Sequence, residues 1–315
     1  MRLVSAKREL VTVTGSTGFV GTHLIPKLTE KYDVTTIDRV DAKTDYFATE
    51  KIVSDLCDIN DNLIKHFSEF HGILVHLAAA RSDTESREIY NRDNLYATEN
   101  LLNFLNPRSV IGFVHVSSVA AIAGKKIHDS KTEPRKSDDW YRYTKYLQEK
   151  RVEDWCKEHN IPFIILLPSA ITSEDDEKFN TNVGRLKTYA KFIPIWPQID
   201  VKKSTTSMNL IVDSIMTCCD HISENHDPSF QIATRAKYLL LDKPTMTITE
   251  TLRSKHGVKN FVKIPHIKSI LTYFALILDK LPLIKTGFTV DRAHKLFEDT
   301  HFHAHGEIKD WDNRW

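Results

Sequence analysis

The feature that most constrains this chain is a cluster of three glycines within seven residues, Gly15, Gly18 and Gly21, in a sequence of 315 residues that holds only 10 glycines. The cluster follows residues 9–14, a β-branched run typical of a short buried strand. It opens residues 21–31, where apolar residues recur at helical spacing. The pattern therefore predicts a strand, a tight glycine turn and a helix in direct succession.

The same alternation continues through the first half of the chain. Further strands are expected at residues 34–37, 51–53, 73–78, 110–116 and 163–167, and helices at residues 90–104 and 141–158. Asn106-Pro107 ends the first of these helices, and Pro168 stops the last strand. Strands that alternate with helices of this length predict an α/β fold, a doubly wound parallel sheet of the Rossmann type with helices on both faces.

The regular alternation of expected strands and helices ends after Pro168. Helices are expected at residues 210–219, 247–255, 267–280 and 289–297, and a short strand at residues 230–233. We therefore expect a dinucleotide-binding domain over residues 1–169 and a smaller mixed substrate-binding domain over residues 170–315, with some late segments returning to the first. The apolar helix at 267–280 is expected in the core of the small domain; a position on a membrane surface is the alternative.

The amino-acid composition of the chain limits the classes of partner that it is expected to bind. Hydrophobic residues make up 41% and charged residues 27% of the chain, which is typical of a folded protein. The 43 Lys and Arg residues are balanced by 42 Asp and Glu residues, so the chain lacks the positive electrostatic potential that binds nucleic acid. Four cysteines without a CxxC pair predict buried thiols in a reducing, cytoplasmic setting. No secretion signal, membrane span or metal site is expected, and His301, His303 and His305 are interpreted as a polar tail.

The glycine turn predicts a site for a dinucleotide. Gly15 would permit the tight turn, Gly18 would let the backbone approach a pyrophosphate, and Gly21 would allow close packing of helix and strand. The first turn of the helix would offer its N–H groups to the phosphates. Asp38, at the end of the next strand, would accept both ribose hydroxyls and favours NAD. Arg39 beside it would grip a 2′-phosphate, so NADP stays open.

A second motif carries acid–base chemistry. Tyr141 and Lys145 form YxxxK, which places both side chains on one face of a helix. A lysine ammonium beside a phenol would lower the pKa of the phenol, and it would also hold the ribose of the cofactor. Tyr141 would then exchange a proton with a carbonyl/hydroxyl pair while hydride moves to or from nicotinamide. Ser117 and Ser118 end a strand upstream, where a hydroxyl would steady the substrate oxygen.

Over residues 9–170 the chain resembles the extended short-chain dehydrogenase/reductase family, and within it the NAD-dependent epimerase/dehydratase group that acts on nucleotide sugars. The motifs appear in the family's order: TGSTGFVG, Asp38, SDL ending before Cys57, HLAAAR from His76 to Arg81, Asn94 in NLYATENLL, VSS and YRYTK. The resemblance implies that Tyr141 is the acid/base, Lys145 the ribose holder and Ser118 the hydroxyl partner, with Ser117 as the open alternative. It also implies a homodimer.

The candidate contacts with small molecules form two sets. For the cofactor they are Gly15, Thr17, Gly18, Phe19, Val20, Gly21, Asp38, Arg39, Asp55, Leu56, Leu77, Ala78, Ala79, Asn94, Lys145, Pro168 and Ser169. For the substrate they are Arg81, Ser117, Arg185 and Lys203. Arg185 and Lys203 would bind a diphosphate, and a solvated basic surface is the alternative interpretation of both.

Three departures from the family's pattern refine the expected function. Leu167 replaces an Arg before the proline, and Ala123-Gly124 replaces a Tyr-Gly pair. Val119 and Ala120 stand where sugar dehydratases carry Asp-Glu, so dehydration is not expected. The expected function is a nucleotide-sugar epimerase in polysaccharide biosynthesis that acts by transient hydride transfer through a keto sugar. A keto-sugar reductase and a non-catalytic NAD(P)-sensing protein are the alternatives.

Overall fold

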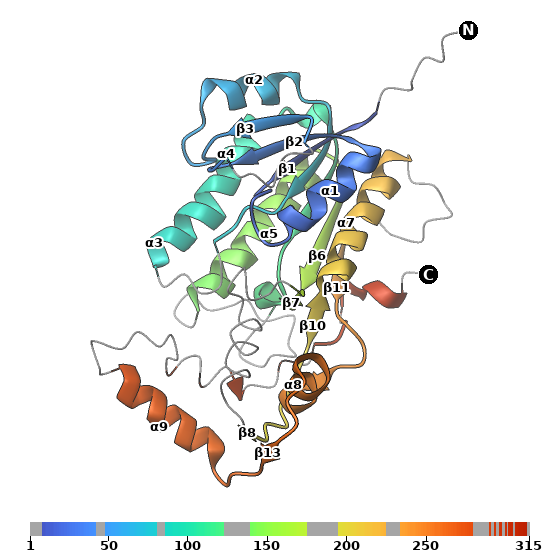
Figure 1. Cartoon of the computed structure of the whole chain (residues 1–315). Coiled ribbons are helices and arrows are strands. Elements are labelled where there is room, and N and C mark those ends of the chain that lie inside the picture. Colours follow the sequence, from blue (N-terminus) through green and yellow to red (C-terminus); the bar gives the residue numbers. More distant parts are fainter. Residues whose placement is uncertain are drawn as a thin grey trace. The chain divides into compact units, whose positions relative to one another are not determined.

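The computed structural model describes residues 8–41, 48–80, 86–122, 139–174, 195–224 and 234–279, with residues 290, 293, 296–297, 300, 302–304 and 306–313. The chain divides into two compact units (Figure 1). Unit 1 comprises Met1–Ile171, Thr206–Leu241 and His303–Trp315, and unit 2 comprises Thr172–Thr205 and Asp242–Phe302. The strand expected at residues 230–233 lies outside the described residues, and so does most of the helix expected at 289–297.

Unit 1 is built on an eight-stranded sheet with the order β14-β11-β6-β5-β4-β1-β2-β3. The strands are β1 (Leu10–Thr14), β2 (Asp33–Asp38), β3 (Glu50–Val53), β4 (Gly72–His76), β5 (Val110–Val116), β6 (Phe163–Pro168), β11 (Ala236–Leu240) and β14 (Ile308–Asp310). Every neighbouring pair is parallel. The order reverses at β1 and β4, the switch point at which such sheets bind ligands. The predicted doubly wound parallel sheet is confirmed.

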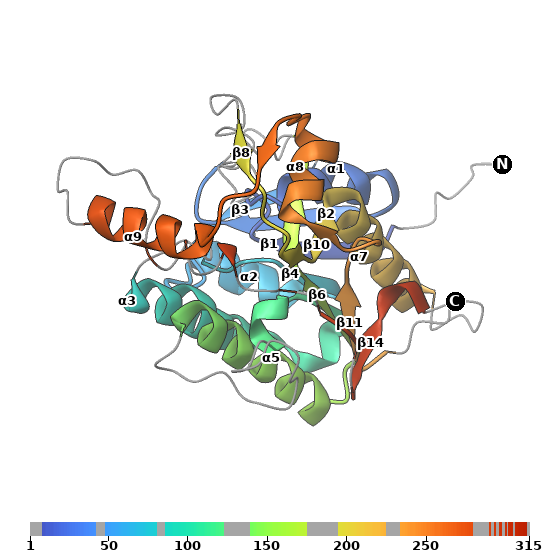
Figure 2. The same cartoon turned by 90° about the horizontal axis from the view of Figure 1, so that it is seen from below.

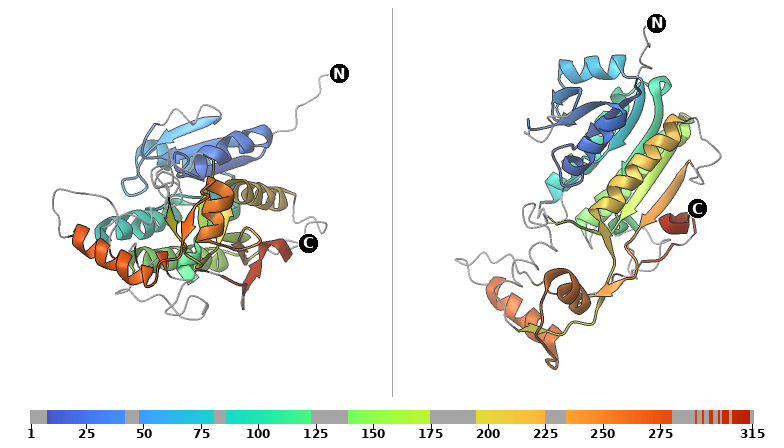
Figure 3. Two further views of the ribbon diagram at one scale, coloured as in Figure 1. Left: turned by 60° about the horizontal axis from the view of Figure 1, so that its bottom comes forward. Right: turned by 45° about the vertical axis from the view of Figure 1, so that its right-hand side comes forward.

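Helices cover both faces of this sheet, because its central strands β1, β4, β5 and β6 are buried on both sides. On one face, α1 (Gly21–Lys31) and α7 (Met208–Ser223) lie side by side, as the right panel of Figure 3 shows, and their apolar side chains join one buried cluster with Val11 and Val13. The helices α2 (Asp61–Glu69), α4 (Ala97–Phe104) and α5 (Trp140–Glu158) cover the other face, where α2 and α5 can be followed in Figure 2. Their apolar side chains form a second buried cluster with Leu74 and Phe113.

Four elements of unit 1 differ from expectation. The helix expected at 90–104 is α3 (Arg87–Tyr90), then a π-helical stretch (Asn91–Tyr96), then α4. The strands β11 and β14 were not predicted: they have five and three residues, and they form through pairing with strands distant in sequence. The helix α7 begins earlier than expected because the side chain of Ser207 accepts from the Leu210 amide and caps it.

Unit 2 is assembled from short elements. They are β8 (Trp196–Pro197), β9 (Lys202–Lys203), β12 (Met246–Thr247), α8 (Ile248–His256), β13 (Phe261–Val262) and α9 (Ile267–Asp279). β7 (Ala170–Thr172) and β10 (Thr205–Ser207) carry the chain from one unit to the other. A small core gathers Trp196, Ile199, Ile248, Leu252 and Val258.

The helix α9 corrects one expectation. A place in the core of the small domain was expected for it, yet Ile270, Tyr273 and Phe274 are 49%, 67% and 52% exposed. Only Ala275 among its described side chains is buried. The prediction was wrong because periodicity identifies an apolar face but does not say what covers it.

Candidate active site

In the glycine turn after β1, the positions of Gly15 and Gly21 have no space for a side chain. Gly15 adopts φ +75°, a left-handed conformation that favours glycine. A Cβ atom on Gly15 would lie 2.7 Å from the backbone nitrogen of Ala78, and one on Gly21 would lie 2.4 Å from the carbonyl oxygen of Ser16. The turn therefore packs directly against the segment that follows β4 and against the start of α1.

The N-terminus of α1 faces this turn. The amide of Gly18 donates to the Gly15 carbonyl over 3.1 Å, and the amide of Thr22 donates to the Gly18 carbonyl over 3.0 Å, so the turn runs continuously into the helix. No described side chain caps the helix at Val20. Because an uncapped helix N-terminus carries partial positive charge, it suits the phosphates of a dinucleotide.

Asp38, at the end of β2, is tied to the glycine turn. Its Oδ2 accepts from the amide of Thr17 over 2.8 Å, and its Oδ1 accepts from the amide of Arg39 over 2.8 Å. A carboxylate offers about four acceptor positions, so both oxygens retain capacity for hydroxyl donors. The side chain is half-buried at the rim of the turn.

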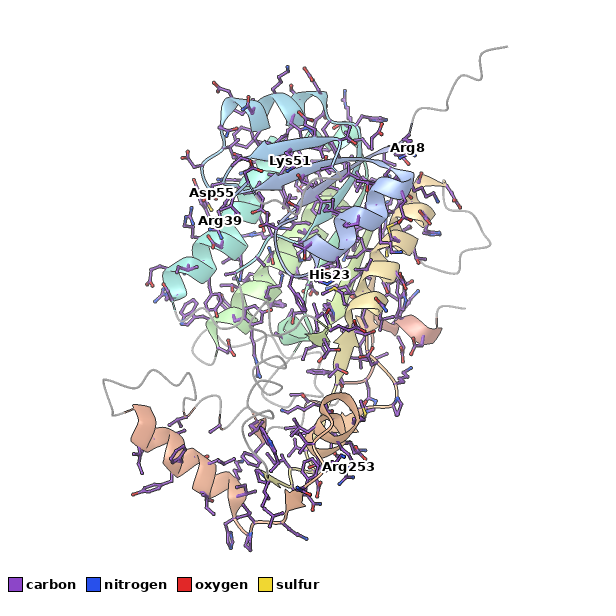
Figure 4. All side chains as sticks on the ribbon, in the orientation of Figure 1. Arg8, His23, Arg39, Lys51, Asp55 and Arg253 are labelled. Atoms are coloured by element: carbon purple, nitrogen blue, oxygen red, sulfur yellow. The ribbon has the colours of Figure 1, made fainter. Side chains whose placement is uncertain are left out.

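A chain of alternating charges runs beside Asp38. Arg39 donates to Asp93 over 3.1 Å, Asp93 pairs with Arg92 over 2.9 Å, and Arg92 pairs with Asp55. Figure 4 shows Arg39 and Asp55 side by side at this edge. Although burial raises the pKa of Asp55, hydrogen bonds from the Cys57 amide and from Arg92 lower it below its ordinary value. The guanidinium of Arg39, the candidate for a 2′-phosphate, is thus already neutralised by a carboxylate.

The segment after β4 is fastened at both ends. The amide of Leu77 donates to the Thr14 carbonyl over 3.1 Å, which holds the segment against β1. The amide of Ala80 donates to Asn94 Oδ1 over 2.7 Å, and Asn94 Nδ2 donates to Thr144 Oγ1 over 2.9 Å. Asn94, fully buried, therefore links residues 77–80 to the helix α5.

Tyr141 lies in the first turn of α5. Asp139 caps the helix by accepting from the Tyr141 and Arg142 amides over 3.0 and 3.2 Å. The Tyr141 and Ser118 side chains are hydrogen-bonded to each other. Burial raises the pKa of Tyr141, the Ser118 hydrogen bond opposes this, and the Asp139 charge adds to the rise. The expectation that Lys145 lowers this pKa is wrong: burial is the largest cause of the rise, and Lys145 is not among the groups that shift it.

Lys145, one turn along α5, is 3% exposed. Its Nζ donates to Gln148 Oε1 over 2.6 Å and to the Val116 carbonyl over 3.3 Å. Burial lowers the pKa of Lys145 to about 8, and the Glu149 charge opposes this shift. The ammonium is therefore already held in place by neutral acceptors.

The two serines after β5 have different partners. Ser117 Oγ donates to Glu149 Oε2 over 2.6 Å, and Glu149 Oε1 accepts from Lys237 over 2.7 Å. Ser117 is 5% exposed and belongs to this buried network. Ser118, by contrast, contacts the phenol of Tyr141.

A buried polar layer beneath Lys145 was not anticipated from the sequence. His76 Nδ1 lies 2.7 Å from Thr14 Oγ1, and its Nε2 lies 3.0 Å from Thr98 Oγ1. Gln148 Nε2 donates to Thr98 Oγ1 over 2.9 Å and to the Ala78 carbonyl over 3.1 Å. Burial, with the Lys145 charge, lowers the pKa of His76 to about 3, so its ring is neutral. The sequence carried one signal of this layer. Polar residues stand within strands that are otherwise apolar, and another polar residue follows Lys145 at helical spacing.

The remaining candidates fall in several places. Pro168 is buried at the end of β6, and the amide of Ser169 donates to Thr206 Oγ1 over 2.9 Å. Leu56 is buried, and Ala79 lies in the segment after β4. Lys203 is half-buried on β9 of unit 2. Arg81, Arg185 and Ala123-Gly124 lie outside the described residues.

Residues 11–191 match the NAD dependent epimerase/dehydratase family. The chain belongs to this family. It is an NAD-dependent enzyme of the extended short-chain dehydrogenase/reductase type. None of the helices in the described part of the chain meets the length and hydropathy that a membrane span requires, and no group of three His, Cys, Asp or Glu side chains there is placed to hold a metal.

Similar proteins cover most of the chain. The UDP-glucose 4-epimerase of Vibrio cholerae is 26% identical over 75% of this chain and 76% of its own length. The N-acetyl-alpha-D-glucosaminyl-diphospho-ditrans,octacis-undecaprenol 4-epimerase of Escherichia coli O157:H7 is 23% identical over 93% of this chain and 87% of its own. The UDP-glucose 4-epimerase structure of Thermotoga maritima superposes with a TM-score of 0.65 at 16% identity, over 82% of this chain and 86% of that one, which shows a shared fold.

Proposed function

We propose that this protein interconverts epimers of a hexose attached to a diphosphate, by transient oxidation to a keto sugar. The observation that carries the proposal is the hydrogen-bonded pair of Tyr141 and Ser118, with Lys145 one turn along the same helix. The pair lies where β5 ends, on the edge of the sheet that also carries the glycine turn. Acid–base and cofactor-binding groups thus share one edge.

The residues present fit NAD. A Cβ atom on Gly15 or Gly21 would collide with the chain's own backbone, so these glycines permit the tight turn and the close packing of helix and strand that a dinucleotide-binding loop requires. Asp38 would bind the adenosine ribose and Lys145 the nicotinamide ribose, while Asp55 and Leu56 would line the adenine side. Residues 77–79, Asn94, Pro168 and Ser169 would complete the contacts. NAD, when bound, supplies the acceptor and later the donor of hydride.

Residues of the chain itself would donate and accept the proton of the sugar hydroxyl. Burial keeps the phenol of Tyr141 protonated, which is the form that donates to a keto oxygen. The Ser118 hydrogen bond favours the phenolate, which takes the proton from a sugar hydroxyl. Epimerisation uses both forms in turn: one proton is removed on oxidation and the same proton is returned on reduction. The balance between burial and Ser118 therefore suits a reaction that runs in both directions.

The diphosphate is the shared part of the candidate substrates. The names of the two relatives specify a sugar on UDP and a sugar on a polyprenol diphosphate. Arg185 and Lys203 are our candidates for binding this group, and Arg81 is our candidate for the sugar. Ser117 donates to Glu149 in the buried network, so we do not assign it to the substrate here. Action in polysaccharide biosynthesis, a homodimer and a cytoplasmic location belong to the same proposal.

The first experiment denatures freshly purified protein and measures the NAD released. Near-stoichiometric NAD, with interconversion of UDP-glucose and UDP-galactose or of their N-acetyl forms without added cofactor, supports the epimerase. Consumption of added NADH by a keto sugar, with no retained NAD, would favour the reductase. Tyr141→Phe should retain NAD and lose turnover by about 10²–10⁴-fold. Unchanged function in this variant would instead favour a sensor that only binds NAD(P).

A further inference from the structure

The helix α9 exposes an apolar stripe. Ile270, Tyr273, Phe274 and Ile277 stand at positions i, i+3, i+4 and i+7, and they are 49%, 67%, 52% and 41% exposed. Ala275, on the opposite side, is fully buried. The side of the helix that faces away from unit 2's interior is therefore the apolar one.

Such a stripe is the reverse of an ordinary surface helix. Solvent-facing positions usually carry charged or polar residues, and a continuous exposed apolar patch marks a site of protein or membrane interaction. The two most exposed members, Tyr273 and Phe274, are aromatic. Aromatic rings are favoured at the boundary between lipid headgroups and acyl chains.

The charge around the stripe indicates which partner covers it. Residues 253–285 contain one acidic residue, Asp279, against seven basic ones: Arg253, Lys255, Lys259, Lys263, Lys268, Lys280 and Lys285. The whole chain, with 43 basic and 42 acidic residues, has no such excess. Lys268 lies in the first turn of α9, and the other six basic residues flank the helix on both sides in the sequence, the pattern of a segment that binds anionic lipid headgroups.

The same charge argues against a second copy of the chain as the partner. Two such segments placed face to face would bring like charges together around the apolar contact. A spanning helix is also excluded for α9, because it has 13 residues and a bilayer needs about 20. The remaining arrangement is a helix that lies in the plane of the membrane surface.

We propose that α9 binds this protein to the surface of a membrane that contains anionic lipids. The stripe of Ile270, Tyr273, Phe274 and Ile277 enters the boundary between headgroups and acyl chains, and the flanking lysines bind the lipid phosphates. The proposal concerns the surface of unit 2 and does not depend on the identity of the sugar.

The test uses flotation of the full chain with vesicles. The wild-type protein should float with vesicles of equal parts phosphatidylglycerol and phosphatidylcholine, and much less with phosphatidylcholine alone. High salt should weaken the binding because it screens the lysines. The double variant Tyr273→Ser/Phe274→Ser should reduce the bound fraction about tenfold, since two rings no longer enter the lipid.

A matched variant controls for loss of exposed apolar area in general. Ile64 and Phe104 are 42% and 44% exposed on helices of unit 1. Ile64→Ser/Phe104→Ser should float like the wild type, and NAD content with the circular dichroism spectrum should confirm that both double variants are folded. Absence of flotation with the anionic vesicles would overturn the proposal, as would flotation that the α9 variant leaves unchanged. A third outcome is that the wild-type protein self-associates without binding vesicles, and that the α9 variant abolishes this self-association while the control variant does not. That outcome would assign the stripe to a second copy of the chain instead.

Discussion

Gln148 accepts a 2.6 Å hydrogen bond from the ammonium of Lys145, three residues before it on α5, and both side chains are buried. The same amide donates to the Ala78 carbonyl over 3.1 Å. Gln148 thus joins the lysine that is the candidate for holding the ribose to the segment that follows β4. We regard it as a positioning residue, because it acts on the reaction through Lys145.

Replacing Gln148 by Leu should weaken the binding of NAD about tenfold, since Lys145 loses its oriented acceptor. Gln148→Glu keeps an acceptor and adds a negative charge, which should raise the pKa of Lys145 above its value of about 8. The measurement is NAD affinity as a function of pH for the three proteins. A purely structural role for Gln148 would move the affinity and leave the pH midpoint where it is.

Mutation of Ser117 and of Ser118 should have different effects on turnover and on stability. Ser118→Ala should lower kcat by about 10²-fold and raise the pKa of Tyr141 in the pH–rate profile, because Ser118 stabilises the phenolate. Ser117→Ala should leave kcat close to wild type and destabilise the fold by about 1–3 kcal/mol, because Glu149 loses a buried donor. Kinetics and urea unfolding of both variants check this. The reverse outcome would make Ser117 the catalytic hydroxyl.

Glycine at position 21 should be essential for cofactor binding. The Cβ of Gly21→Ala would lie 2.4 Å from a carbonyl oxygen, so α1 must shift away from the turn and NAD retention should be lost. Gly257→Ala is the matched control: Gly257 has φ +68°, and its Cβ would meet nothing within 4 Å. That variant should cost about 1 kcal/mol in stability and retain NAD. Equal NAD content in the two variants would contradict the assigned role of the turn.

Coenzyme preference should depend on the Arg39–Asp93 ion pair. Asp93→Asn releases the guanidinium of Arg39 from its carboxylate, so the affinity for NADP relative to NAD should rise about tenfold. Titrations with both coenzymes measure the ratio. Adding Arg39→Gln to this variant should cancel the gain; a gain that survives would show that Arg39 does not contact the 2′-phosphate.

Burial of Lys145 should make stability depend on pH. Its pKa falls from 10.5 in the unfolded chain to about 8 in the fold, so between these values the unfolded state binds more protons and stability rises with pH. For the cofactor-free protein the free energy of unfolding should increase by about 2 kcal/mol from pH 7 to pH 9.5 through this group alone. Lys145→Met lacks the increase, so the difference between the two proteins isolates it. Parallel pH curves for wild type and variant would refute the shifted pKa.

Local pattern was sufficient for the α/β alternation and for the glycine turn. The expected strand at 110–116 coincides with β5, and the helices expected at 21–31 and 141–158 agree with α1 and α5 to within one residue. These segments were predictable because apolar spacing, Gly, Pro and capping residues act over a few neighbours in the chain. The motifs that these elements carry also sufficed to indicate the family.

Contacts between segments that are distant in the sequence could not be predicted from that local pattern. The pairing of β11 with β6, the contact of Ser117 with Glu149 and the hydrogen bonds of His76 join residues far apart in the chain, and each depends on how the sheet orders its strands. Folding also set the protonation of the site, because burial raises the pKa of Tyr141 and lowers the pKa of Lys145. The outward face of α9 is the same kind of result: the spacing of Ile270, Phe274 and Ile277 specifies an apolar stripe, and only packing leaves it uncovered.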